Sequence, residues 1–141
     1  MCRARCGWAS ADPLYEKYHD REWGRPLKDD HALFELLILE GCQAGLSWIT
    51  VLRKREHYRK VYDGFDPAKI ARYTPAKLAR LLADPGIIRH RGKIEGTIRG
   101  ARAFLRIEER QGFSPFLWSF APAPGPRPAS LAHVPGQTAQ S

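Results

Sequence analysis

The sequence has few cysteines, no long apolar run and no convincing strand pattern. Its 141 residues contain only three cysteines, a small odd number that favours reduced thiols or metal ligands over a disulfide framework. No segment reaches the roughly eighteen apolar residues of a membrane helix, and residues 1–6 lack the apolar core of a signal peptide. The sequence therefore predicts a cytoplasmic protein with one modest domain.

Acidic residues are also scarce relative to basic ones. Twenty-three Lys and Arg face fifteen Asp and Glu, which gives a formal charge of +8 and a pI near 9.8. This excess favours a polyanionic partner through counterion release and electrostatic steering. Nucleic acid is the first candidate partner, and an acidic membrane surface is the second.

Capping residues predict helices throughout the chain. Asp29 or Asp30 is placed to begin an apolar helix that ends near Gly41, and Ser47 is placed to begin the next one. Three short helices are predicted where a capping residue precedes a proline, at Asp66-Pro67, Thr74-Pro75 and Ser114-Pro115.

The rest of the chain divides into a long basic helix and a proline-rich end. The helix after Thr74 breaks at residues 84–86 and is followed by a basic helix over about residues 90–110. We expect an all-α domain over residues 1–120. Five of the eleven prolines fall within residues 121–141, which predicts a linker or a poorly ordered tail.

The turn at residues 84–86 lies between two of these helices. Such a turn can aim backbone N–H groups and a helix N-terminus at one phosphate, and basic side chains follow it directly. The segment is interpreted as a helix-hairpin-helix element that holds a DNA backbone without reading its sequence. The expected contacts are made by Gly86, Ile88, Arg89, Arg91 and Lys93. The alternative is an ordinary helix connection with a solvated basic face.

Glu40 follows an apolar run over residues 32–39 that only Glu35 interrupts. A carboxylate at the end of such a helix, beside Gly41 and near Trp48, is expected to be partly buried. Burial is costly unless a donor meets the carboxylate, and a bound ligand could supply that donor. The alternative is a helix end that lies in solvent.

Aromatic side chains are dense around this helix and in the N-terminal segment. They offer faces on which an extruded base can stack: Trp8, Tyr15, Tyr18, Trp23 and Trp48. Aromatics at this density can also be core residues. Together with Glu40, the rings favour a cationic or electron-poor heterocycle, because ring faces attract positive charge and a carboxylate accepts hydrogen bonds from an exocyclic amine.

Cys6 and His19 are candidate zinc ligands, with Cys2 as a possible third. Thiolate and imidazole both suit zinc, but a closed structural site needs four ligands. The alternative is a free thiol and an unrelated histidine.

Five strings of the sequence closely resemble the bacterial DNA-3-methyladenine glycosylase I family. They span residues 6–8, 12–15, 18–24, 39–52 and 86–94, and the likeness covers essentially the first 120 residues. The resemblance implies an all-helical member of the helix-hairpin-helix glycosylase superfamily. Such a protein would act as a monomer on alkylated double-stranded DNA, flip out 3-methyladenine and hydrolyse its N-glycosidic bond.

The resemblance also implies a role for each candidate residue. The flipped base would be held by Glu40, Trp48 and Tyr18, with Trp8, Tyr15 and Trp23 around the pocket. Gly45 and Leu46 would approach the gap left in the duplex, and Cys6 and His19 would form half of a zinc site. Because adenine methylated at N3 is already cationic, Glu40 is assigned to recognition and electrostatic stabilisation, and the water-activating group is left unassigned.

The sequence departs from this family at its end. Family members are expected to continue with a helical segment that supplies a second histidine and cysteine to the zinc, whereas this sequence stops at Ser141. We therefore expect a C-terminally truncated glycosylase. Three hypotheses follow: an active enzyme, a module that binds DNA or the modified base without excision, and a nonfunctional fragment.

Overall fold

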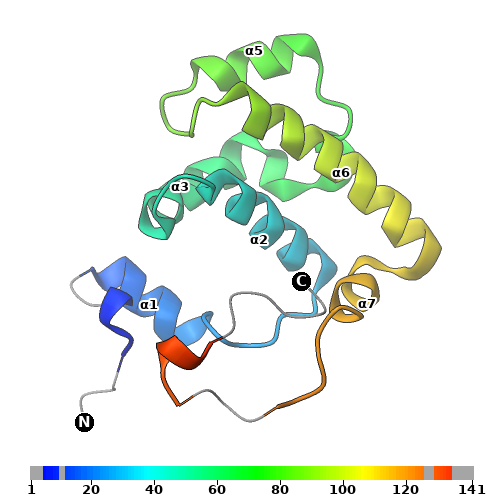
Figure 1. The fold of residues 1–141 in the computed structure, drawn as a ribbon. Helices are drawn as coiled ribbons and strands as arrows, with labels where there is room; N and C mark the ends of the chain where they lie inside the picture. The colour runs from blue at the N-terminus through cyan, green and yellow to red at the C-terminus, as the bar shows by residue number, and fades with distance from the viewer. Residues whose placement is uncertain (1–4, 10–11, 126–128, 135–141) are drawn as a thin grey trace.

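The computed structural model describes residues 5–9, 12–125 and 129–134, and these residues are helical without strands (Figure 1). The α-helices are α1 (Pro13–Arg21), α2 (Asp30–Gln43), α3 (Trp48–Val61), α4 (Pro67–Ile70), α5 (Pro75–Ala83), α6 (Arg91–Gln111) and α7 (Phe113–Trp118). Short 3-10 helices are η1 (Gly7–Ala9), η2 (Asp63–Phe65) and η3 (Leu131–His133). The predicted all-α class is confirmed. None of the described helices is long and apolar enough to cross a membrane.

Helix α2 lies at the centre of the core. Its N-cap Asp29 accepts a hydrogen bond from the N–H of Ala32, which satisfies one of the unpaired donors at the helix start. Phe34 and Leu39 are fully buried, and the helix contacts both α3 and α6. Because α2 is apolar around most of its circumference, it needs neighbours on several sides.

Helix α6 covers the other side of α2. Its buried residues recur every three or four positions, at Ile94, Ile98, Ala101 and Phe104, so one stripe of the helix faces the core. The same helix contacts α2, α4, α5 and α7 (Figure 1). The short connection from α5 to α6 over residues 84–90 is therefore held at both ends by packed helices.

Helix α1 forms a separate layer beside α3 (Figure 1). Tyr18 is the buried residue on this polar helix, so packing alone holds it weakly. Two arginines of α3 also attach it: Arg53 donates to Asp12 at 2.6 Å, and Arg55 donates to Glu22 at 2.8 Å.

Glu35 is a buried carboxylate between α2 and α3. It is 8% exposed and accepts hydrogen bonds from Arg55 at 2.8 Å and from Arg59 at 2.7 Å. Burial pushes the pKa of Glu35 upward, but the hydrogen bonds from Arg59 and Arg55 outweigh it, so the pKa lies below its ordinary value. Since Arg55 also holds Glu22, this network joins α1, α2 and α3.

Most predicted helix starts are confirmed, and one is wrong. Asp29, Ser47, Asp66 and Thr74 occupy N-cap positions. Ser114 does not, because α7 begins earlier, at Phe113 after Gly112. The Ser114 N–H donates at 2.6 Å to Asp30 on α2, so a tertiary contact replaces the local cap.

Replacing Glu35 with Gln should destabilise the fold by about 3 kcal/mol at neutral pH, because two arginines lose a buried anionic partner. A group with a lowered pKa adds stability above its unfolded pKa and loses it as the pH falls through the folded value. The difference between wild type and variant should therefore shrink below about pH 4.3.

Urea unfolding at pH 7 and in acid measures both effects, with Glu109→Gln as the matched control because Glu109 is an exposed carboxylate on α6. A Glu35 variant as stable as the Glu109 variant at pH 7 would contradict a structural role for the network.

Candidate base-binding site

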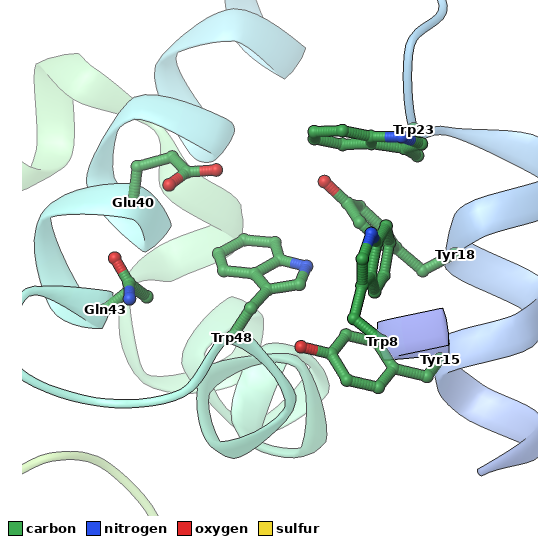
Figure 2. A pocket seen from close by; sticks show the side chains of 7 residues that line it. All are labelled: Trp8, Tyr15, Tyr18, Trp23, Glu40, Gln43 and Trp48. Carbon is green, nitrogen blue, oxygen red and sulfur yellow. The ribbon is translucent and has the colours of Figure 1, made fainter. Parts of the chain in front are cut away.

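A cavity of about 200 Å³ opens between α1, the end of α2 and the start of α3 (Figure 2). Its lining combines aromatic rings with one carboxylate and one amide: Trp8, Tyr15, Tyr18, Trp23, Glu40, Gln43 and Trp48. All six residues predicted to surround a base therefore meet at one cavity.

The aromatic rings contact one another in series. The centroid of Trp8 lies 5.1 Å from that of Tyr15 and 5.4 Å from that of Trp23, both edge to face, and Tyr18 lies 5.4 Å from Trp48. Such pairs are favourable beyond their buried area. Trp8 and Trp23 are 38% and 53% exposed, so these rings form a wall of the cavity and not a closed core.

Glu40 faces this wall across the cavity. The prediction that Glu40 is partly buried is wrong, because the residue is exposed. The last turn of α2 extends beyond the core, and α1 lies on the far side of the opening (Figure 2). Among the described residues, no hydrogen bond or ion pair is made to this carboxylate. Its oxygens are therefore available to a ligand that enters the cavity.

Two hydrogen-bond donors, on Trp48 and Tyr18, complete the set of polar groups in the cavity. The indole N–H of Trp48 is buried without an acceptor among the described atoms, and a buried unpaired donor is uncommon. Burial, followed by the charges of Glu40 and Glu22, raises the pKa of Tyr18, so its hydroxyl keeps its proton at neutral pH. The cavity offers flat apolar faces, one free anion and protonated donors.

Gln43 is a cavity residue that the sequence analysis missed. It lies one helical turn after Glu40 on α2, and residues three apart share a helix face. Its side-chain amide donates to the carbonyl of Leu46 at 2.5 Å, which fixes the turn between α2 and α3. The i, i+3 spacing from Glu40 was the available signal.

Gly45 and Leu46 belong to this turn, which Ser47 separates from the cavity residue Trp48. Gly45 has a φ of +81°, a conformation that favours glycine. Leu46 is 38% exposed, so its apolar side chain is accessible from solvent. Their insertion into a DNA gap stays a prediction.

The hairpin over residues 84–90 is held tightly against α3. Asp84 accepts hydrogen bonds from the Gly86 N–H at 2.7 Å and pairs with His57 at 2.8 Å. A Cβ on Gly86 would lie 2.4 Å from the His57 ring, so a larger residue at 86 would displace that ring from its present position beside Asp84. The Ile88 N–H donates to the Tyr58 hydroxyl at 3.1 Å.

The basic residues at the end of the hairpin and in the first turn of α6 divide into two kinds. Arg89 and Arg91 are exposed, as a phosphate contact requires. Lys93 is partly buried, and its ammonium donates to the carbonyls of Cys42 and Ala44. The predicted DNA contacts of this segment stay predictions, but Lys93 already has protein partners.

Cys6 and His19, the candidate zinc ligands, are neighbours, and their role in binding zinc stays a prediction. The Cys6 N–H donates to Nε2 of His19 at 3.3 Å, and Nδ1 of His19 contacts Asp20. Within residues 5–9, 12–125 and 129–134, no group of three or more His, Cys, Asp or Glu side chains could hold a metal ion. The candidate third ligand Cys2 lies outside the described residues.

Known proteins resemble both the sequence and the fold. DNA-3-methyladenine glycosylase 1 of Escherichia coli (strain K12) is 56% identical over 117 residues, which cover 82% of this chain and 63% of that protein. A crystal structure of 3-methyladenine DNA glycosylase I (TAG) has a TM-score of 0.91 at 50% identity, covering 97% of this chain and 77% of the other. The Staphylococcus aureus structure described as the structural basis of 3-methyladenine recognition has a TM-score of 0.79 at 44% identity, covering 82% and 62%.

The chain thus spans somewhat less than two thirds of the length of its Escherichia coli relative. The family model described as methyladenine glycosylase matches residues 8–141, which is almost the whole chain. The matched region contains the cavity and the hairpin. The chain therefore belongs to the methyladenine glycosylase family.

Proposed function

We propose that this protein removes 3-methyladenine from alkylated double-stranded DNA, acting as a monomer that flips the damaged base into the ring-lined cavity. The observation that carries the proposal is the unpaired Glu40 carboxylate facing aromatic walls. An anion beside ring faces selects a cationic heterocycle. The family membership and the relatives named above support the same substrate.

The reaction needs little acid catalysis. Adenine methylated at N3 carries a positive charge, so the electron pair of the broken C1′–N9 bond leaves the base neutral. Water adds to C1′ and releases a proton to solvent. Flipping such a base is less costly because its stacking and pairing are weakened. Glu40 would stabilise the charged base and the positive charge that develops on the sugar.

A second candidate function is binding without hydrolysis. Among the described residues that line the cavity, Glu40 is the one carboxylate, and none is a histidine, lysine or aspartate. The cavity therefore offers recognition groups but no separate residue to activate water. A protein of this kind would bind the free base and protect damaged DNA while leaving the glycosidic bonds intact.

Zinc is a separate proposal. Cys6 and His19 are adjacent, and thiolate and imidazole are suitable zinc donors. Because the Cys6 backbone N–H donates to Nε2 of His19 and Nδ1 contacts Asp20, zinc binding would replace one of these two contacts. The other two ligands would come from outside the described residues. The role of the metal would be to stabilise the fold of the N-terminal segment, which carries Trp8.

Glu40→Gln should weaken binding of free 3-methyladenine about tenfold to a hundredfold, because a hydrogen bond to a charged partner is worth about 1.5–3 kcal/mol. Quenching of tryptophan fluorescence measures the affinity, and release of free base from methylated DNA measures excision. Glu109→Gln removes the same charge away from the cavity and should leave both unchanged.

Equal base affinity in the two variants would show that the Glu40 carboxylate is incidental. Normal base binding by wild type without any release of base would favour the second candidate function.

Trp23→Ala should weaken base binding by about tenfold, within the range of about 1–3 kcal/mol for one stacked base. Trp23 is 53% exposed, so the melting temperature should change little. Trp118→Ala is the matched control, because Trp118 is also partly exposed but lies outside the cavity lining. The idea fails if both tryptophan variants bind the base alike.

Cys6→Ser should reduce the zinc content of protein purified with added zinc, because the hydroxyl is a poorer ligand than the thiolate. Metal analysis gives the stoichiometry, and Cys42→Ser tests a buried cysteine far from His19 in sequence. The zinc proposal would be contradicted if the wild-type protein contained no zinc and its melting temperature did not change when a chelator was added.

A further inference from the structure

Lys93 connects the hairpin to the end of α2. It lies in the first turn of α6, and its Nζ donates to the carbonyl of Cys42 at 2.8 Å and to that of Ala44 at 2.6 Å. These two contacts use two of the three donors on the ammonium group. A side chain expected to bind phosphate is therefore already bound inside the protein.

The end of α2 needs such a partner. The last carbonyls of any helix lack intrahelical donors, and a cation at this end is favourable because it meets the negative end of the helix dipole. In α1 and α3 the N–H of the C-cap residue donates to a backbone carbonyl of the last turn, that of Tyr18 in α1 and that of Tyr58 in α3. At Ala44, the C-cap of α2, the backbone leaves the helix with φ −48° and ψ 119°, and Lys93 satisfies its carbonyl.

The last turn of α2 carries the polar side of the cavity. Glu40 and Gln43 both line the cavity from this turn, with the Glu40 carboxylate directed toward the rings (Figure 2). Gln43 and Leu46 also exchange hydrogen bonds, with the Leu46 N–H donating to the Gln43 carbonyl at 2.7 Å. The position of the 43–46 turn therefore fixes where these side chains meet a base.

The other end of the connection is rigid. The hairpin that precedes Lys93 is fixed to α3 by the His57–Asp84 pair and by the hydrogen bond from the Ile88 N–H to Tyr58. Lys93 itself is followed by the buried residue Ile94. Its ammonium therefore holds the cavity turn at a defined distance from the hairpin.

We propose that Lys93 is a positioning residue that sets the base cavity relative to the DNA-binding hairpin, and that it is not a phosphate ligand. The inference rests on the proposed function, because it assumes that the cavity takes a base while the hairpin holds the DNA backbone. The phosphate contacts are left to the exposed Arg89 and Arg91.

Salt dependence separates the two roles of a lysine. The logarithm of the DNA affinity falls as the logarithm of the salt concentration rises, and losing one phosphate ligand makes this slope less steep by about 0.9. Such a loss leaves the empty cavity intact. Losing a positioning residue leaves the slope unchanged but displaces the groups that hold the base. A displacement of about 1 Å can lower a reaction rate by up to about a hundredfold.

The experiment compares Lys93→Met with Arg91→Met, which removes an exposed charge two residues away. Lys93→Met should lower both free 3-methyladenine affinity and the rate of base release by at least about tenfold, with an unchanged salt slope on undamaged duplex. Arg91→Met should instead reduce the magnitude of the salt slope on undamaged duplex and leave the affinity for the free base unchanged. Lys93→Arg keeps the charge and the donors and should recover most of the base affinity.

Binding is measured below the melting temperature of every variant, so lost stability alone does not move the affinity. Should Lys93→Met not fold, Lys93→Gln takes its place: its amide can still donate to one carbonyl, so a smaller loss of base affinity is expected, again with an unchanged salt slope. A Lys93 variant with a reduced salt slope and normal base affinity would overturn the inference.

If the proposed function is wrong, the wild-type protein itself does not bind the base, which distinguishes this result from failure of the inference about Lys93.

In that case amide hydrogen exchange over residues 42–47 tests the contact between Lys93 and this turn directly, because loss of Lys93 should speed exchange there. Unchanged exchange would overturn the inference.

Discussion

The buried carboxylate of Glu35 is the interaction on which the site depends most. It is paired with two arginines of α3, and one of these, Arg55, also holds Glu22 at the end of α1. The cavity has a wall on each of these three helices. Because a charge buried without partners is strongly unfavourable, the network permits few alternative arrangements of the helices. The distance between the ring wall and Glu40 follows from a charge cluster that does not itself line the cavity.

The molecule presents opposite charges at two places. Glu40 gives the cavity a free negative charge, while Arg89 and Arg91 give the hairpin exposed positive charge on a chain of net charge +8. A substrate that joins a cationic base to an anionic DNA backbone needs negative charge at one place and positive charge at another. A protein surface of one sign would repel either the base or the backbone. Helix α2 ends at the first place and α6 begins at the second. The proposed function therefore needs a fixed relation between these two helix ends.

The fold was largely predictable from local rules, whereas the contacts that position the site were not. Asp29, Asp66 and Thr74 predicted helix starts because a cap acts on the adjacent two or three residues. Ser114 failed because its backbone N–H is bound by Asp30, which is 84 residues away in sequence. The cavity rings were predicted by composition and by resemblance, but the exposure of Glu40 depends on how far α2 extends beyond its neighbours. Lys93 could be identified as basic, but spacing alone carries no information about its carbonyl partners.

The close contact between Gly86 and His57 links the evolution of two distant positions. The His57 ring occupies the place that a methyl group on residue 86 would need, and Asp84 holds that ring. A larger residue at 86 requires either a smaller residue at 57 or a His57 ring that leaves Asp84, and both changes cost Asp84 its imidazole partner. Homologous sequences that keep His57 and Asp84 should therefore keep glycine at 86, a covariation that arises from packing and not from contact with DNA.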